Sequence, residues 1–309
     1  MKKLSMFLIC TLLSQLSIAN TNYTIGTGSQ SGTYYPLGGM LAKVWGEKIP
    51  NFNMRAEVTA ASVENTIKVS TNKQLAGIAM GNVVLQANAG KKPFPRKMPI
   101  SVLFALYPNV VQFIVPADSK ITKLSDLKGK KVSLGAPGSG TRVSAINILS
   151  SLGINESDIK AQSLNYTATT RALSNNQIDA GVIVGSLSTG AITEVALTHN
   201  IRILSFSKQE IEKVIADNPS YEGLNVPAGN YNKVPAFTAP AVWNVLVVNK
   251  TLDEKLAYEM TKTAFENMKQ IQNAINDTKF TTIENMTKLK GAELHPGALK
   301  YRNEKLKTK

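Results

Sequence analysis

The sequence has 309 residues and a hydrophobic content of 43%, which is enough to bury the cores of two domains and excludes a disordered chain. The formal net charge is +14, but the basic residues are scattered and their longest clusters, at 91–97 and 300–309, are short. This pattern argues against nucleic-acid binding and leaves an anionic solute, an anionic lipid surface or an acidic partner open.

The first nineteen residues have the pattern of a secretory signal. Lys2 and Lys3 precede an apolar run over 4–16, and small residues allow cleavage after Ala19. The alternatives are a buried helix or a membrane anchor, but the run is short for a membrane span. Cleavage lowers the charge from +14 to +12 by removing the two lysines, and it removes Cys10, the only cysteine. An exported protein without disulfides suits a bacterial periplasm.

The mature chain begins with an α/β unit. Its first strand leads through a Gly/Ser/Thr loop, GTGSQSGT, into a helix. The predicted elements are strands at 22–27, 53–58 and 76–80 and helices at 34–48 and 62–72. Strands that alternate with helices form parallel sheets, whose ligands bind beyond the carboxyl ends of the strands.

A second unit repeats this pattern. Strands are predicted at 131–135, 161–164 and 179–184, and helices at 140–152 and 167–175. Ser31-Gly32-Thr33 in the first loop matches Ser139-Gly140-Thr141 in the second, and LAGIAMGNV at 75–83 matches DAGVIVGSL at 179–187. Two matches in the same order predict two similarly built α/β units.

Two apolar segments connect the units. The segment at 100–116 leaves the first unit and the segment at 239–249 returns to it, so together they predict a hinge. The polar stretch at 216–240 is predicted to be surface loop or short helices. After the return, apolar residues recur every three or four positions over 256–275, which predicts one amphipathic helix of the first lobe.

Five motifs resemble those of the TAXI family, the solute receptors of tripartite ATP-independent periplasmic (TRAP) transporters. They are IGTGSQSGTYYPLGG, ASVEN at 61–65, PGSGTR at 137–142, IDAGVIV at 178–184 and LHPGALKYRNE at 294–304. The resemblance implies a two-lobed periplasmic-binding-protein fold of the type II-like, Venus-flytrap kind, with a hinge of two crossing segments and a ligand cleft between the lobes. Lobe I would comprise 20–113 and 241–309, and lobe II would comprise 114–240. The family implies closure on a small C5 acid, glutamate-like or 2-oxoglutarate-like, and its delivery to a permease driven by an ion gradient.

The two Gly/Ser/Thr loops carry the main candidate ligand-binding residues. A helix N-terminus offers backbone N–H groups and a favourable dipole to an anion, and hydroxyl groups add donors. The candidates are Ser31, Gly32, Thr33 and Tyr34 in the first loop and Ser139, Gly140, Thr141 and Arg142 in the second. Two such ends across a cleft would hold a solute with an acid group at each end. The alternative is that each Ser-Gly-Thr is only a helix cap with a tight turn.

Arg142 is the candidate for pairing with the charge of the solute. A guanidinium offers a planar fork to a carboxylate at any accessible pH, although a solvated arginine is the alternative. Because adjacent helix residues point about 100° apart, only one of Tyr34 and Tyr35 should face the solute.

Other candidates follow the second and third strands. Ser62 is predicted to cap helix 62–72, Glu64 to face water, and Asn65 either to bind the solute or to serve the fold. After the third strand of each unit, the residues predicted to face the cleft are Gly81, Asn82, Gly185 and Ser186. The glycines could instead mark positions of close backbone approach.

The chain departs from its family after the third strand. Where relatives carry a glutamine and an aspartate, this sequence has Met80 and Asn82. If that aspartate serves a ligand ammonium, its absence makes burial of an ammonium costly. The hypothesis is therefore a 2-oxo or 2-hydroxy C5 diacid rather than an amino acid.

Enzyme activity finds little support in the sequence. The first loop has the spacing G-x-G-x-x-x-G, no acidic residue follows the next strand in the place that would hold a ribose, and no Gly-Lys-Ser/Thr or G-x-S-x-G motif occurs. The only histidines, His199 and His295, are far apart, so no metal, cofactor or catalytic residue is expected. His295 is predicted to lie in a structural turn or at a surface that meets the permease.

The sequence thus predicts a monomeric periplasmic receptor without enzyme activity or a nucleic-acid partner. It would capture a small anionic metabolite, a C5 dicarboxylate such as 2-oxoglutarate or 2-hydroxyglutarate rather than glutamate, and deliver it to TRAP permease subunits. The alternative is an exported immunogenic or adhesin-type protein with the same fold and no transport ligand.

Overall fold

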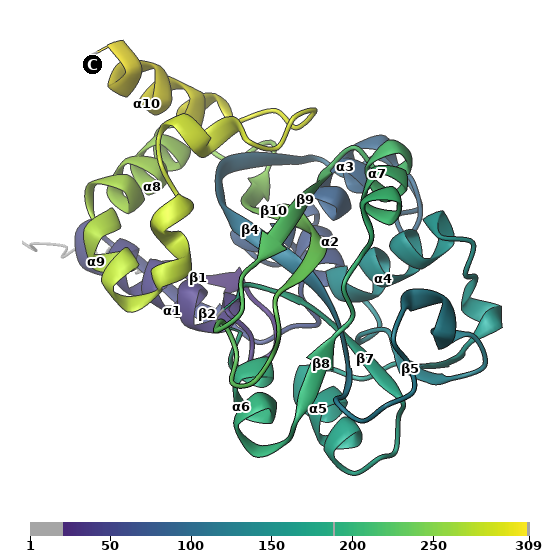
Figure 1. The fold of residues 1–309 in the computed structure, drawn as a ribbon. Coiled ribbons are helices and arrows are strands. Elements are labelled where there is room, and N and C mark those ends of the chain that lie inside the picture. The colour runs from purple at the N-terminus through teal and green to yellow at the C-terminus, as the bar shows by residue number, and fades with distance from the viewer. Residues whose placement is uncertain (1–20, 188, 308–309) are drawn as a thin grey trace, which may run out of the picture.

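The computed structural model describes residues 21–187 and 189–307, so the predicted signal and Cys10 lie outside the described residues. The strands are β1 (Thr21–Gly26), β2 (Phe52–Glu57), β3 (Ala76–Met80), β4 (Ile100–Pro116), β5 (Lys131–Ser133), β6 (Lys160–Gln162), β7 (Ala180–Gly185), β8 (Ile201–Ile203), β9 (Tyr221–Val226) and β10 (Phe237–Asn249). The helices are α1 (Tyr34–Lys48), α2 (Ser62–Ser70), α3 (Gly81–Ala89), α4 (Gly140–Ser151), α5 (Tyr166–Ser174), α6 (Gly190–Thr198), α7 (Lys208–Asp217), α8 (Glu254–Glu266), α9 (Met268–Ala274) and α10 (Pro296–Lys307). The predicted α/β class is confirmed (Figure 1).

The strands join in one sheet with the order β2-β1-β3-β10-β4-β7-β5-β6, with β8 added beside β4 and β9 beside β10. Lobe I carries the parallel strands β2, β1 and β3, and lobe II carries the parallel strands β7, β5 and β6. The long antiparallel strands β4 and β10 lie between them and pair with strands of both lobes (Figure 1). Parallel strands on each side therefore direct their carboxyl ends towards the middle of the molecule.

The two hinge segments are continuous strands rather than flexible connections. β4 begins to pair with β7 at Val110. β10 pairs with β9 up to Val242 and with β3 from Asn244 onwards. The predicted lobe boundaries, at 113/114 and 240/241, lie within three residues of these changes of partner. Their use as domain boundaries stays a prediction.

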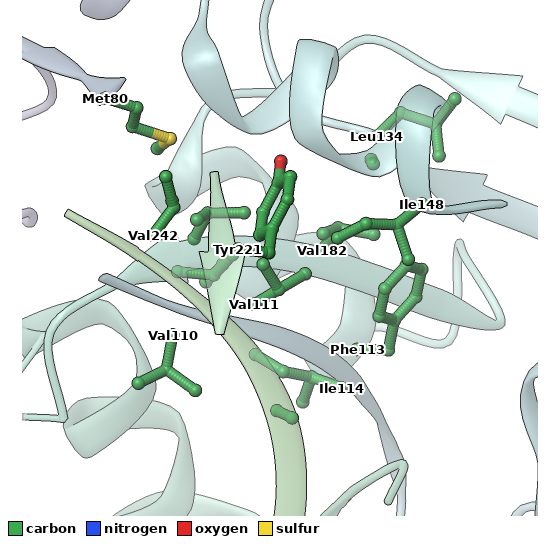
Figure 2. Packing of buried hydrophobic residues seen from close by; sticks show 14 of the residues in the cluster. Met80, Val110, Val111, Phe113, Ile114, Leu134, Ile148, Val182, Tyr221 and Val242 are labelled. Carbon is green, nitrogen blue, oxygen red and sulfur yellow. The ribbon is translucent and has the colours of Figure 1, made fainter. Parts of the chain in front are cut away.

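Burial on both faces explains the apolar sequence of the hinge strands. Figure 2 shows side chains of β4, β7 and β10 packed together, including Val110, Val111, Phe113, Ile114, Val182 and Val242. Each fully buried aliphatic or aromatic side chain contributes about 1.5–3 kcal/mol of transfer free energy, so this packing stabilises the pairing of the hinge strands. A second core cluster in lobe I packs α1, α8 and α9 against the sheet and includes Trp45 and Phe104.

Two expectations about the C-terminal half were wrong. Residues 221–226, predicted as loop or short helix, form β9, because they pair with β10 along their whole length. The predicted helix over 256–275 divides at Asn267 into α8 and α9; the Asn267 side-chain amide donates to the Thr263 carbonyl at 2.8 Å. Within the described residues, no helix combines the length and apolar character that crossing a membrane requires.

Candidate functional site

A cavity of about 260 Å³ lies where the carboxyl ends of the strands of both lobes meet. Lobe I lines it with the β1–α1 loop, the β2–α2 loop and the end of β3. Lobe II lines it with the β5–α4 loop, the β6–α5 loop and the end of β7, while β4 contributes Tyr107 and Asn109. This is where parallel α/β sheets bind ligands, as the sequence predicts.

The β1–α1 loop brings the N-terminus of α1 to the cavity. The Gly32 backbone N–H donates to the Ser29 carbonyl at 2.9 Å, which turns the chain, and the helix begins at Tyr34 after Thr33. Thr33 does not cap the helix with its side chain. The first turn of α1 therefore leaves backbone donors directed to this end of the helix.

Two helix N-termini of lobe II reach the same cavity. Ser139 caps α4, because its hydroxyl accepts from the Arg142 N–H at 3.1 Å and donates to the Ala136 carbonyl at 2.6 Å. Asn165 caps α5 by accepting from the Ala168 N–H at 2.9 Å. The repeat is therefore not in register, since α4 begins within its Ser-Gly-Thr and α1 begins after it.

The Tyr166 hydroxyl has a fixed direction of hydrogen bonding. It donates to the Val184 carbonyl at 2.6 Å, so Thr141 must be the donor in their 3.0 Å contact. Burial raises the pKa of Tyr166 to about 12, so the phenol is neutral at physiological pH. The Thr141 hydroxyl can therefore accept a hydrogen bond from a solute but cannot donate one.

The floor of the cavity is a polar network between the hinge strands. Tyr34 donates its hydroxyl to Asn244 Oδ1, and the Asn109 amide donates to the same oxygen at 3.0 Å. The Asn244 amide donates to the Tyr107 carbonyl at 2.9 Å. Asn244 is fully buried and lies at an irregularity of the β10–β4 pairing, so the side chain completes hydrogen bonds that the ladder omits there.

Two polar atoms beside the cavity have no hydrogen-bond partner among the described residues. They are the hydroxyl oxygen of Tyr107 and the side-chain oxygen of Asn109, both on side chains that are about 1% exposed. Burial raises the pKa of Tyr107 well above its usual value, so its hydroxyl is neutral. Because an unpaired buried polar group costs about 1–3 kcal/mol, a ligand or water is the expected partner.

The β1–α1 loop of lobe I makes direct contacts with lobe II beside the cavity. The Thr33 and Ser186 hydroxyls lie 2.7 Å apart, and those of Ser31 and Thr167 lie 3.1 Å apart. The Ala191 N–H donates to the Ser31 carbonyl at 3.1 Å. The described structure is therefore a closed arrangement of the lobes.

The N-terminus of α2 is used by the protein itself. The N–H groups of Val63 and Glu64 both donate to the Gly138 carbonyl of lobe II, each at 3.2 Å. Ser62, predicted as the cap, is instead the first residue of the helix and accepts from the Met80 N–H at 3.1 Å. This helix end joins the lobes rather than facing the cavity.

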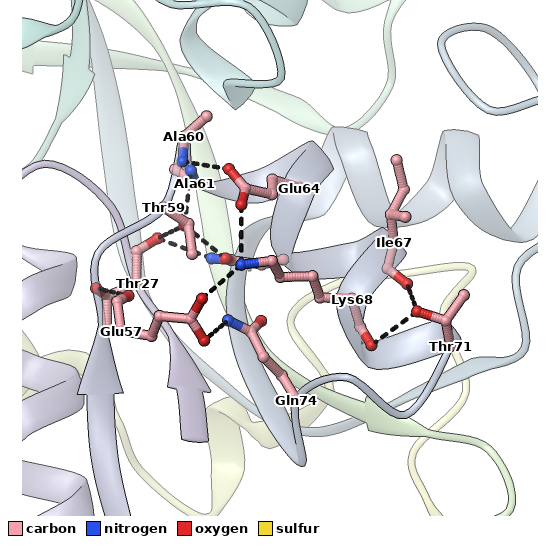
Figure 3. A network of polar contacts seen from close by, with 11 residues as sticks. Thr27, Glu57, Thr59, Ala60, Ala61, Glu64, Ile67, Lys68, Thr71 and Gln74 are labelled. Carbon is pink, nitrogen blue, oxygen red and sulfur yellow. Dashed lines mark hydrogen bonds and ion pairs between the residues drawn. The ribbon is translucent and has the colours of Figure 1, made fainter. Parts of the chain in front are cut away.

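Glu64 was predicted to face water, but its carboxylate makes contacts within lobe I. Figure 3 shows its carboxylate accepting from the Ala60 N–H at 2.7 Å and pairing with Lys68 at 3.0 Å. Lys68 also pairs with Glu57 at 2.5 Å, and this contact lowers the pKa of Glu57 against the effect of burial. Ala61, which lines the cavity, has φ +84°, a conformation that costs a non-glycine residue free energy and is held by this network.

Six of the thirteen predicted site residues line the cavity: Gly32, Thr33, Tyr34, Ser139, Thr141 and Gly185. Ser31 and Ser186 lie beside it in the contacts between the lobes. The other five, Ser62, Asn65, Asn82, Gly140 and Arg142, do not line it.

Arg142 binds within lobe II. Its guanidinium pairs with Glu156 and donates to the Ser163 hydroxyl at 3.1 Å. The geometry therefore favours the alternative of a surface arginine over a carboxylate fork in the cleft.

Asn65 and Asn82 serve contacts within the fold. Asn65 is fully buried, donates to the Thr27 and Ile78 carbonyls at 2.7 and 2.9 Å, and accepts from Thr59 at 2.7 Å. Asn82 donates to Ser144 at 3.1 Å and to Tyr221 at 2.9 Å. Gly81 also faces away, since an added Cβ would meet Leu289.

The sequence interpretation missed lining residues of the hinge strand β4, of the end of β7 and of four loops. They are Gly28, Ser29, Gln30, Val58, Thr59, Ala60, Ala61, Tyr107, Asn109, Ala136, Asn165, Tyr166, Thr167 and Val184. Tyr107 and Asn109 carried a usable signal, because they interrupt a long apolar run. Met80, singled out as a departure from the family, does line the cavity.

The cavity has a neutral lining. Among the described residues that line it, none is Asp, Glu, His, Lys or Arg. No group of three or more potential metal ligands occurs in the described part of the chain. The arrangement offers hydroxyls, amides and helix N-termini, which can hold a small polar molecule by hydrogen bonds.

The fold and this cleft define a two-lobed α/β protein with a cavity between its lobes. The chain belongs to the NMT1-like family, whose model matches residues 25–305. Its fold is similar to that of the alkanesulfonate-binding protein SsuA from Xanthomonas axonopodis pv. citri bound to MOPS, at 14% identity and a TM-score of 0.54, covering 91% of this chain and 83% of that one. It is also similar to the ligand-binding component of an ABC-type import system from Staphylococcus aureus with zinc bound, at 10% identity and a TM-score of 0.50, covering 93% and 91%. Such low identities establish the fold alone.

Proposed function

We propose that this protein is a periplasmic solute receptor that closes its two lobes around a small acid and hands it to a membrane permease. The observation that carries the proposal is the cavity between the lobes, whose lining includes Tyr107 and Asn109, two residues with unpaired buried polar atoms. A ligand that contacts both lobes stabilises the closed form by its differential affinity, and a permease can recognise that form.

The proposed solute is a C5 dicarboxylate, 2-oxoglutarate or 2-hydroxyglutarate, rather than glutamate. The N-termini of α1 in lobe I and of α4 and α5 in lobe II would hold its carboxylates through backbone N–H groups and hydroxyls. No acidic side chain among the described lining residues could pair with an ammonium, so a buried amino group would lack a counter-charge. The excess of basic residues would attract an anionic solute to the protein.

The neutral lining also supports binding rather than catalysis. General acid–base and nucleophilic mechanisms need an ionisable or activated group beside the substrate, and the described lining offers only neutral phenols, hydroxyls and amides. The TRAP-type permease is proposed from the sequence motifs; uptake of the solute into proteoliposomes that contain such a permease, with and without the receptor, would test it.

The test of the solute class is calorimetry on residues 20–309, unfolded and refolded to remove any solute bound during expression. We expect 2-oxoglutarate and 2-hydroxyglutarate to bind and glutamate to bind more weakly. Ligand at a hundred times its dissociation constant should add about 2.7 kcal/mol to the free energy of unfolding, which a thermal shift can detect. Tighter binding of glutamate would overturn the choice of solute, and the absence of any bound solute in a broad screen would favour the adhesin-type alternative.

A further inference from the structure

The orientation of each amide in the floor of the cavity follows from its partners. The Asn244 amide nitrogen must face the Tyr107 carbonyl, at 2.9 Å, because a carbonyl can only accept. The Asn244 oxygen therefore lies on the other side of the amide, where the Tyr34 hydroxyl and the Asn109 amide nitrogen donate to it. Asn109 must then direct its nitrogen to Asn244 and to the Val184 carbonyl, at 3.0 and 3.3 Å.

This network leaves one end of Asn109 unused. Both described partners of its nitrogen are acceptors that belong to the sheet, so the nitrogen is not available to a solute. The oxygen is buried without a described partner, and Asn109 lines the cavity. An amide oxygen can only accept, so a solute in the site would pair with it by offering a hydrogen-bond donor.

We propose that the solute is a hydroxy acid whose hydroxyl donates to Asn109 Oδ1, and that the site selects it over the corresponding oxo acid. The inference rests on the proposed receptor function and narrows its solute. The oxygen of a ketone would face another acceptor and leave Asn109 unpaired. An ammonium would supply a donor, but it would bring a charge that no described lining residue neutralises. A hydroxyl is a donor without that charge.

Tyr107 provides a matched comparison within the same strand. Its hydroxyl can both donate and accept, and it also lacks a described partner beside the cavity. It can donate to the oxygen of a hydroxyl or of a ketone equally well. Asn109 should therefore set the preference between the two acids, while Tyr107 should strengthen both.

The experiment compares pairs of acids that differ only in a hydroxyl and a ketone, by calorimetry on the refolded wild-type protein. The pairs are both enantiomers of 2-hydroxyglutarate against 2-oxoglutarate, lactate against pyruvate, and 3-hydroxybutyrate against acetoacetate. We expect one hydroxy acid to bind at least about tenfold more tightly than its oxo partner, the effect of one buried hydrogen bond. Equal or tighter binding of every oxo acid would overturn the inference and leave the receptor function intact, and failure of all seven compounds would overturn the hydroxy-acid inference itself.

Two variants then locate the preference. Asn109→Ala should reduce the ratio of affinities within the bound pair to below about twofold, and Tyr107→Phe should weaken both acids while keeping the ratio. The same hydroxy acid is also compared with its analogue without the hydroxyl, such as glutarate for the C5 pair; Asn109→Ala should remove that preference too. A ratio that survives in folded Asn109→Ala would overturn the role of Asn109. If that variant does not fold, the wild-type comparison still decides the hydroxy-acid preference.

Discussion

The guanidinium of Arg142 contacts Glu156 and Ser163 rather than the cavity. None of the described residues that line the cavity has a basic side chain that could pair with an anion. Hydroxyls, amides and helix ends take that role in the proposed complex. Such donors recognise the shape and hydrogen-bonding pattern of a solute more than its charge.

Arg142→Ala is accordingly expected to leave solute affinity within about twofold of wild type. Its ion pair with Glu156 is partly exposed, with side-chain exposures of 24% and 41%, and such pairs contribute about 0.2–1 kcal/mol to the free energy of unfolding. Calorimetry and urea unfolding would measure both effects. Glu156→Gln serves as the control and should lose a similar amount of stability. A tenfold loss of affinity in Arg142→Ala but not in Glu156→Gln would show that the Arg142 guanidinium contacts the solute.

Residue types predicted the candidate site only in part. The Gly/Ser/Thr loops indicated where the cavity lies, because loops after parallel strands meet at one edge of a sheet. They could not show which of Thr141 and Arg142 faces it, since that depends on the rotation of α4. Tyr107 and Asn109 were missed because apolar neighbours on both sides marked their segment as hinge.

Helix α2 of lobe I and helix α4 of lobe II contact each other at their N-termini. Gly140, the first residue of α4, lies so near α2 that an added Cβ would stand 2.5 Å from Ser62 Oγ and 3.0 Å from Met80 Sδ. The neighbouring Gly138 carbonyl receives the first N–H groups of α2. Closure thus depends on the absence of a side chain at position 140.

Gly140→Ala should therefore oppose closure without disturbing either lobe alone. We expect about a tenfold loss of solute affinity and an almost unchanged melting temperature without solute. Gly39→Ala in α1 is the matched control, because a Cβ there meets nothing within 4 Å and alanine favours the helix by about 0.5–1 kcal/mol. Wild-type affinity in Gly140→Ala would show that this contact does not limit closure.

The elements were well predicted in β1–α1–β2–α2–β3 and in β5–α4–β6–α5–β7, whereas α3, α6, β8, α7 and α10 were not predicted. The predictions failed at β9, whose pairing with β10 is set by tertiary structure, and at Asn267, where a side chain ends the helix. Local sequence does not specify a distant strand partner, so β9 could not be predicted from it.

His295 links the C-terminal region to β4 and so bears on the stability of the whole molecule. Its backbone N–H donates to the Val102 carbonyl at 2.8 Å, and the residue is about 2% exposed. The ring Nδ1 accepts from the Gly297 N–H at 3.3 Å, so the ring proton is on Nε2 and a second proton would displace this bond. Burial lowers the pKa of His295.

Stability should consequently fall in acid. Because the folded pKa of His295 is lowered, its contribution is complete above the unfolded pKa of about 6.5 and is lost as the pH falls through the folded value. Urea unfolding at pH 7.5, 6.5 and 5.5 would measure the loss. His295→Gln should show a smaller pH dependence, whereas His199→Gln, at an exposed position, should keep that of wild type. Identical slopes in all three proteins would exclude His295 as the cause.

The position of β10 in the sheet also governs the order in which the chain can fold. β3 ends at Met80, but Met80 pairs with Asn244, so lobe I lacks a central strand until most of the polypeptide has been synthesised. Contacts between such distant segments slow folding, because the long loop between them must first be closed. A nascent chain with this connectivity therefore cannot complete the sheet beside β3 before the segment that forms β10 has left the ribosome.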